Sequence, residues 1–98
     1  MLTAEVIFIP IGTQSTTLSK YIKAAIESMN DSEVKVYPRA MATEIEADDL
    51  ETLFSAIKKG QEAIMNMGVK RVVVSLKVDI RTDKDAFLEK KIDSIGFQ

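Results

Sequence analysis

The sequence of 98 residues contains no histidine, no cysteine and no tryptophan. Without cysteine, the chain can form no disulfide and offers no thiolate ligand or thiol nucleophile. Without histidine, it lacks the commonest general base and the commonest zinc ligand, so catalytic pairs of serine or cysteine with histidine are excluded. The residues that remain favour binding over catalysis, and we expect neither an enzyme nor a metal site.

A strong excess of one charge is also missing, because 13 Lys and Arg nearly balance 15 Asp and Glu. A net charge of −2 provides no basic field that would hold nucleic acid. No segment reaches the roughly 20 apolar residues that span a bilayer. The start of the chain has no basic stretch and meets a carboxylate at Glu5, which argues against a signal peptide. We therefore expect a cytoplasmic protein that binds neither nucleic acid nor membranes.

The residues that are present suit one globular domain over residues 1–98, with 46% hydrophobic and 29% charged residues. Runs rich in β-branched residues or alternating in polarity predict four strands, and apolar residues at helical spacing predict three helices. The strands fall at residues 6–9, 34–37, 41–46 and 71–81, and the helices at residues 18–29, 50–67 and 87–95.

This order of elements predicts an α+β fold. A strand–helix–strand crossover is right-handed, and the short break at Pro38 makes the second and third strands a hairpin. The compact solution is the ferredoxin-like βαββαβ sandwich, in which a four-stranded antiparallel sheet of order 4-1-3-2 carries two helices on one face. A short C-terminal helix follows the last strand.

Alternation assigns each strand residue to one face of this sheet. The apolar residues from Val72 to Ile80 should meet the helices, together with Met41, Thr43 and Ile45. The opposite face is left open by two helices. It should carry Lys35, Tyr37, Glu44, Glu46, Arg71, Val73, Ser75, Lys77, Asp79 and Arg81.

The first strand is apolar on both sides and adds either Val6 and Phe8 or Ile7 and Ile9 to the open face. Two copies stacked on this face would cover the apolar strip and neutralise opposite charges. We therefore expect a homodimer or a dimer of dimers. The alternative is a monomer whose polar face is solvated.

Two carboxylates, Glu44 and Glu46, share the open face and could bind a metal ion or a protonated nitrogen base. They could equally form cross-strand ion pairs with Lys35, Lys77 or Arg81.

Other polar residues have two interpretations each. Lys77 and Arg81 could grip a carboxylate or phosphate, or form a salt-bridged seam between subunits. The hydroxyl-rich loop after Gly12 could hold an anion or simply cap the following helix. Tyr21 and Tyr37 could stack on a flat ring or serve only packing.

Taken together, these residues resemble the small thiamine-binding protein family. The resemblance covers nearly the whole chain in the same order. It rests on Pro10-Ile11-Gly12-Thr13 with Ser19 and Tyr21, on Tyr37-Pro38 with Ala42-Thr43-Glu44-Ile45-Glu46, and on Arg71-Val72-Val73 and Lys77-Val78-Asp79-Ile80-Arg81 with Asp83-Lys84.

The resemblance implies a non-catalytic homo-oligomer, a dimer or tetramer, that binds thiamine or its hydroxymethylpyrimidine part at a subunit interface. The alternative is an oligomeric regulatory or interaction module. Where the family usually has glycine, this chain has Ala42 and Ala47, and the added methyl groups imply a narrower pocket or a different ligand. The site residues implied are Thr13, Ser19, Tyr37, Thr43, Glu44, Glu46, Lys77 and Arg81.

Overall fold

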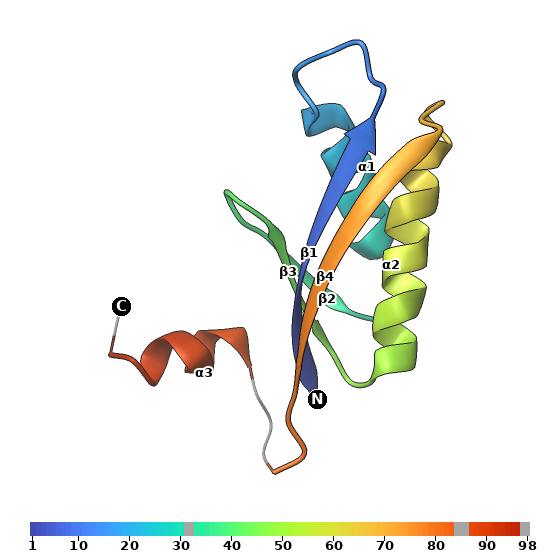
Figure 1. Cartoon of the computed structure of the whole chain (residues 1–98). Coiled ribbons are helices and arrows are strands. Elements are labelled where there is room, and N and C mark those ends of the chain that lie inside the picture. The colour runs from blue at the N-terminus through green and yellow to red at the C-terminus, as the bar shows by residue number, and fades with distance from the viewer. Residues whose placement is uncertain (31–32, 84–86, 97–98) are drawn as a thin grey trace.

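Four strands and three helices follow one another along the chain in the order expected from the sequence. A computed structural model describes residues 1–30, 33–83 and 87–96, and Lys84 lies outside them. The strands are β1 (Leu2–Ile11), β2 (Lys35–Pro38), β3 (Thr43–Ala47) and β4 (Arg71–Ile80). The helices are α1 (Ser19–Asn30), α2 (Leu50–Met65) and the short α3 (Leu88–Asp93) (Figure 1).

The strands form one sheet in the order β2-β3-β1-β4, and every neighbouring pair is antiparallel. Read from its other edge this is the order 4-1-3-2. Helices α1 and α2 pack together on one face of the sheet (Figure 1). The α+β ferredoxin-like prediction is therefore confirmed.

The core lies between the sheet and these two helices. The even-numbered residues of β1 point into it, and Val6 and Phe8 are at most 4% exposed. Gly60 of α2 allows this close packing, because a Cβ atom there would lie 2.8 Å from Cζ of Phe8. The odd-numbered residues, Ile7 and Ile9 among them, therefore belong to the open face, which settles the two alternatives left by the sequence.

The predicted position of Met41 is wrong. The hairpin turns at Arg39, whose backbone N–H donates to the carbonyl of Ala42 at 3.0 Å, so β3 begins only at Thr43. Met41 lies in this turn and is 88% exposed. Thr43 and Ile45 face the core as expected, because they pair with Val6 and Ala4 of β1.

Helix α3 lies at the end of the sheet where β1 begins, away from the β1–α1 loop (Figure 1). It is a single short helix whose buried member is Leu88. Within residues 1–30, 33–83 and 87–96, no helix combines the length and apolar character that crossing a bilayer requires.

Candidate functional site

One polar residue from each strand forms a continuous row across the open face of the sheet. The register pairs Tyr37 of β2 with Glu44 of β3, Glu44 with Glu5 of β1, and Glu5 with Lys77 of β4. Directly opposite residues have Cβ atoms about 4.5–5.5 Å apart and share a face. We call Tyr37, Glu44, Glu5 and Lys77 the charged row.

Arg39 compensates the negative charge of Glu44, one of the two carboxylates in the charged row. Its Nε donates to Oε1 of Glu44 at 2.7 Å. Its guanidinium also lies over the ring of Tyr37, with the guanidinium carbon 5.5 Å from the ring centroid. Glu5 and Glu44 are neighbouring like charges, so their mutual repulsion favours any bound group that is cationic or that donates hydrogen bonds.

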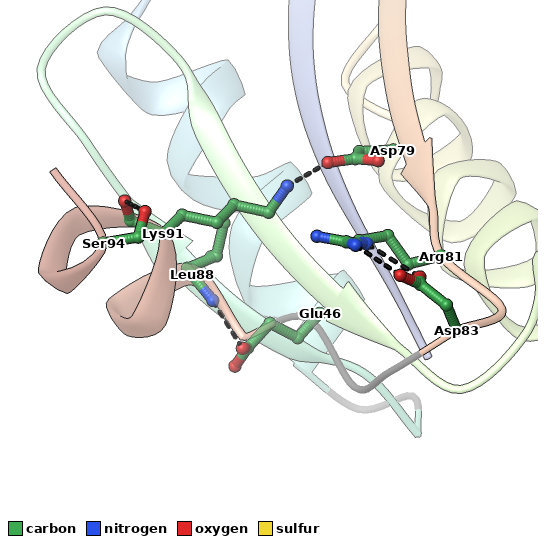
Figure 2. A network of polar contacts seen from close by, with 7 residues as sticks. All are labelled: Glu46, Asp79, Arg81, Asp83, Leu88, Lys91 and Ser94. Carbon is green, nitrogen blue, oxygen red and sulfur yellow. Dashed lines mark hydrogen bonds and ion pairs between the residues drawn. The ribbon is translucent and has the colours of Figure 1, made fainter.

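Glu46 lies in the next row and has a structural role in this fold. Its side chain points out of the same sheet face as Glu44, yet the residue is only 5% exposed. Oε1 accepts a hydrogen bond from the Tyr37 hydroxyl at 2.6 Å. Oε2 accepts one from the backbone N–H of Leu88 at 3.0 Å, which Figure 2 shows. The hydrogen bond to Glu46 raises the pKa of Tyr37 above its usual value, because it holds the phenol proton in place.

An ion pair completes the attachment of α3 to the sheet. The Lys91 ammonium contacts Asp79 of β4 (Figure 2). The hydrogen bond from Lys91 lowers the pKa of Asp79 below its usual value. Helix α3 therefore sits on the row that contains Glu46, Thr3 and Asp79, and it leaves the charged row beside it uncovered.

A hollow of about 440 Å³ opens over the charged row, with α3 as one wall. Ligand pockets usually fall between about 300 and 1,000 Å³. The side chains that give the hollow its polarity are Glu5, Glu44, Lys77, Asp79 and Lys91. In the described part of the chain, no three Asp or Glu residues gather as a metal site would require. The carboxylates of Glu5 and Glu44 in this lining can accept hydrogen bonds from amine groups.

The structure brings three of the eight predicted site residues into the charged row, namely Tyr37, Glu44 and Lys77. Glu46 is adjacent but already has two partners. Thr43 is 5% exposed and faces the helices, so it does not reach the hollow.

The remaining predicted residues lie elsewhere. Arg81 makes two hydrogen bonds to Asp83, at 3.0 Å and 2.6 Å, which also raise the pKa of Arg81 (Figure 2). Thr13 is in the β1–α1 loop and Ser19 begins α1, at the far end of β1 from α3 (Figure 1).

Glu5 and Lys91 are members of the site that the sequence analysis missed. The predicted first strand began at Val6, whereas β1 begins at Leu2. Extending the alternation of β1 by two residues would have placed Glu5 on the open face beside Ile7. No comparable signal existed for Lys91, because its contact with Asp79 depends on where the chain after β4 places α3.

Ala42 and Ala47, where the resemblance implied glycine, lie away from the charged row. Ala47 pairs with Leu2 and is 3% exposed in the core, so its methyl group faces the helices. Ala42 lies in the hairpin turn before β3. Neither methyl group narrows the hollow over the charged row.

The fold and the hollow define a small α+β sandwich with a polar recess on its open sheet face. The sequence matches the family model described as thiamine-binding protein over residues 4–96, and the chain belongs to that family. It is 42% identical over 95 residues to a UPF0045 protein of Methanothermobacter thermautotrophicus, a match that covers 97% of this chain and 96% of the relative.

Solved structures agree with this assignment. The crystal structure of MJ1052 from Methanocaldococcus jannaschii, also a UPF0045 protein, has a TM-score of 0.87 and 41% identity, covering 97% of this chain and 95% of that one. A Thermotoga maritima protein, provisionally tied by its name to thiamine biosynthesis or salvage, has a TM-score of 0.79. Its 20% identity, over 96% of this chain and 97% of that chain, shows a shared fold.

Proposed function

We propose that this protein binds thiamine or its hydroxymethylpyrimidine part in the hollow over the charged row, without changing the ligand chemically and at an interface between copies. The observation that carries this proposal is the pair of neighbouring carboxylates, Glu5 and Glu44, on an exposed sheet face. Membership of the thiamine-binding protein family supports the choice of ligand.

The chemistry of the charged row suits an aminopyrimidine. The exocyclic amine of such a ring donates hydrogen bonds, and its protonated ring nitrogen pairs with a carboxylate. Thiamine adds a cationic thiazolium ring, which carboxylates and aromatic faces also attract. Glu5 and Glu44 supply two acceptors side by side, and a cationic ligand would relieve their repulsion.

The surroundings support binding rather than a reaction. The chain has no histidine or cysteine to act as base or nucleophile. Arg39 donates a hydrogen bond to Glu44, and Lys77 lies opposite Glu5 in the sheet register, so both carboxylates have a cationic neighbour. This role requires only that the ligand be held and released.

Calorimetric titration with thiamine and with hydroxymethylpyrimidine tests the proposal. We expect Glu5→Gln and Glu44→Gln each to weaken binding at least fivefold, since losing a charged hydrogen-bond acceptor costs about 1–3 kcal/mol. Glu62→Gln is the matched control, because it makes the same charge change on α2 and also removes an ion-pair partner, in this case of Lys58. Absence of heat with both compounds at millimolar concentration, or an equal loss in the control variant, would contradict the proposal.

A specific feature favours a second role for the same sheet face, as a surface for self-association. Beyond the charged row the odd-numbered residues of β1 become apolar, and Ile9 is 40% exposed opposite Val73, which is 41% exposed. Ile11 continues this strip at 38% exposure. A contiguous apolar strip bordered by charges suits contact with a second copy, and an oligomeric protein that binds neither compound would support this role alone.

A further inference from the structure

A second hollow, of about 800 Å³, lies at the end of the sheet opposite α3. The β1–α1 loop and the turn between α2 and β4 border it, and both meet at one end of the molecule (Figure 1). Ile11 and Arg71, the last pair of the β1–β4 register, mark its edge. Ile11 lies six positions after Glu5 in β1, so at about 3.4 Å per residue roughly 20 Å separate this hollow from the charged row.

The lining of this second hollow carries charge of one sign. Lys20, Lys70 and Arg71 line it, and no Asp or Glu lies among its described lining residues. Elsewhere the chain intersperses its charges and has a net charge of −2. Three cations without a carboxylate create a local positive potential, which attracts anions. We call Lys20, Lys70 and Arg71 the basic rim.

The residues of the basic rim form no ion pairs within the described part of the chain. None of its three members forms an ion pair there, although Lys23, Arg39, Lys58, Arg81 and Lys91 all do. Lys20 is positioned by its own neighbour, because its Nζ lies 5.0 Å from the centroid of the Tyr21 ring. The rim charges therefore remain available to a ligand.

The loop that borders the hollow is braced and leaves its backbone accessible. The Thr13 hydroxyl donates to the carbonyl of Ser15 at 3.0 Å, and the Ser15 hydroxyl accepts from the N–H of Thr17 at 3.1 Å. Gly12 has φ of +81° and meets no atom within 4 Å where a side chain would stand. Open backbone at such a glycine allows close approach of a ligand, as in many anion-binding loops.

We propose that this second hollow binds a phosphorylated small molecule, with the basic rim holding its phosphate group. Arg71 offers the planar fork that matches phosphate oxygens, and the two lysines add point charges. Apolar residues Ile11, Met67 and Val69 also line the hollow and suit an organic portion of the ligand. The site is independent of the charged row and of the ligand proposed there.

Phenyl phosphate and inorganic phosphate are suitable probes for calorimetry on the full chain at 150 mM salt. The test variant K20Q/K70Q/R71Q removes the basic rim. The control K23Q/K58Q/K59Q makes the same change in net charge on α1 and α2, at residues that do not line the second hollow. We expect phenyl phosphate to bind the unchanged protein more tightly than inorganic phosphate, the test variant to lose at least tenfold in affinity, and the control to lose less than twofold.

Three results would overturn the proposal: no binding of phenyl phosphate to the unchanged protein, an equal loss in both variants, or binding of inorganic phosphate as tight as that of the ester. The first result would show that the second hollow does not bind the ester. The second would show that binding depends on the net charge of the protein and not on the basic rim. The third would show that the organic part of the ligand makes no contact. Titration of the test variant with hydroxymethylpyrimidine distinguishes the two proposals. We expect its affinity for hydroxymethylpyrimidine to equal that of the unchanged protein.

Discussion

Glu46 joins three elements through one carboxylate. It belongs to β3, accepts a hydrogen bond from Tyr37 of β2, and accepts another from the first N–H of α3. Helix α3 has no side-chain cap of its own at Phe87, so Glu46 caps it from a position 42 residues earlier in the chain. Such a cap satisfies a backbone donor that the helix leaves unpaired.

Replacing Glu46 should therefore lower the stability of the fold more than it weakens ligand binding. We expect Glu46→Ala to lower the free energy of unfolding by about 1–3 kcal/mol, because it leaves the half-buried Tyr37 hydroxyl and the buried N–H of Leu88 without acceptors. Urea unfolding followed by circular dichroism measures this change. Glu62→Ala, at an exposed position of α2, should cost far less, and equal losses would contradict the capping role.

Gly60 provides a second test at the scale of single residues. A methyl group there would lie 2.8 Å from Cζ of Phe8 and 3.2 Å from Sδ of Met29. Overpacking costs about 1–3 kcal/mol, which outweighs the gain of about 1 kcal/mol from replacing glycine in a helix. We expect Gly60→Ala to be destabilising in the natural background.

Removing the Phe8 ring should reverse the sign of the stability change caused by Gly60→Ala. In a Phe8→Leu background, Gly60→Ala should become neutral or stabilising, because the steric conflict with Phe8 is gone. Thermal or urea unfolding of the four proteins completes the cycle. An unchanged effect in both backgrounds would show that Phe8 is not the obstacle.

At the scale of elements, helix α3 depends on charge as well as on packing. Lys91 lowers the pKa of Asp79 below its ordinary value of 3.8, so the ionised carboxylate stabilises the docked helix. This contribution is fully present above the ordinary pKa and is lost as the pH falls through the lowered one. We expect α3 to loosen in acid, below about pH 3.8.

The ¹³Cα chemical shifts of Leu88–Asp93 report this loosening in an NMR titration. In Asp79→Asn the helix should be less populated at neutral pH, and acidification should change it less than in the unchanged protein. A variant that follows the same titration curve as the unchanged protein would exclude Asp79 as the group responsible.

The elements differ in how far the sequence predicts them. In β4 the alternation from Ser75 to Ile80 predicted the two faces, but Val74 and Ile80 do not meet the helices as expected, since they are 37% and 54% exposed on this edge strand. Strand β1 is apolar on both faces from Val6 to Ile9, and the polar residues Thr3 and Glu5, which the predicted strand left out, indicate that its odd-numbered residues lie on the open face. The pairing of Glu46 with Leu88 is long-range, so no local pattern announces it. The carboxylate pair was consequently predicted as Glu44 and Glu46, whereas the exposed pair is Glu44 and Glu5.

At the scale of the whole molecule, the open face combines the charged row with the apolar strip formed by Ile7, Ile9, Ile11 and Val73. We expect light scattering to give a mass that is a multiple of the 10.9 kDa subunit. Ile9→Glu and Val73→Glu should both lower that mass to one subunit, because a buried unpaired charge is costly at an interface.

Phe54→Glu is the control for self-association. Phe54 is 53% exposed on α2, on the other layer of the sandwich, so the same substitution there should leave the mass unchanged. A single-subunit mass for the unchanged protein, or dissociation caused equally by all three substitutions, would contradict a role for the apolar strip.

The most direct test of the central claim is to locate the pyrimidine on the protein. Hydroxymethylpyrimidine is added to ¹⁵N-labelled protein, and the backbone amide shifts are followed by NMR. We predict that the largest changes fall at Glu5, Glu44 and Lys77, in the middle of the sheet. Spectra that do not change at millimolar ligand, or changes confined to the distant end around Gly12 and Lys70, would contradict the claim.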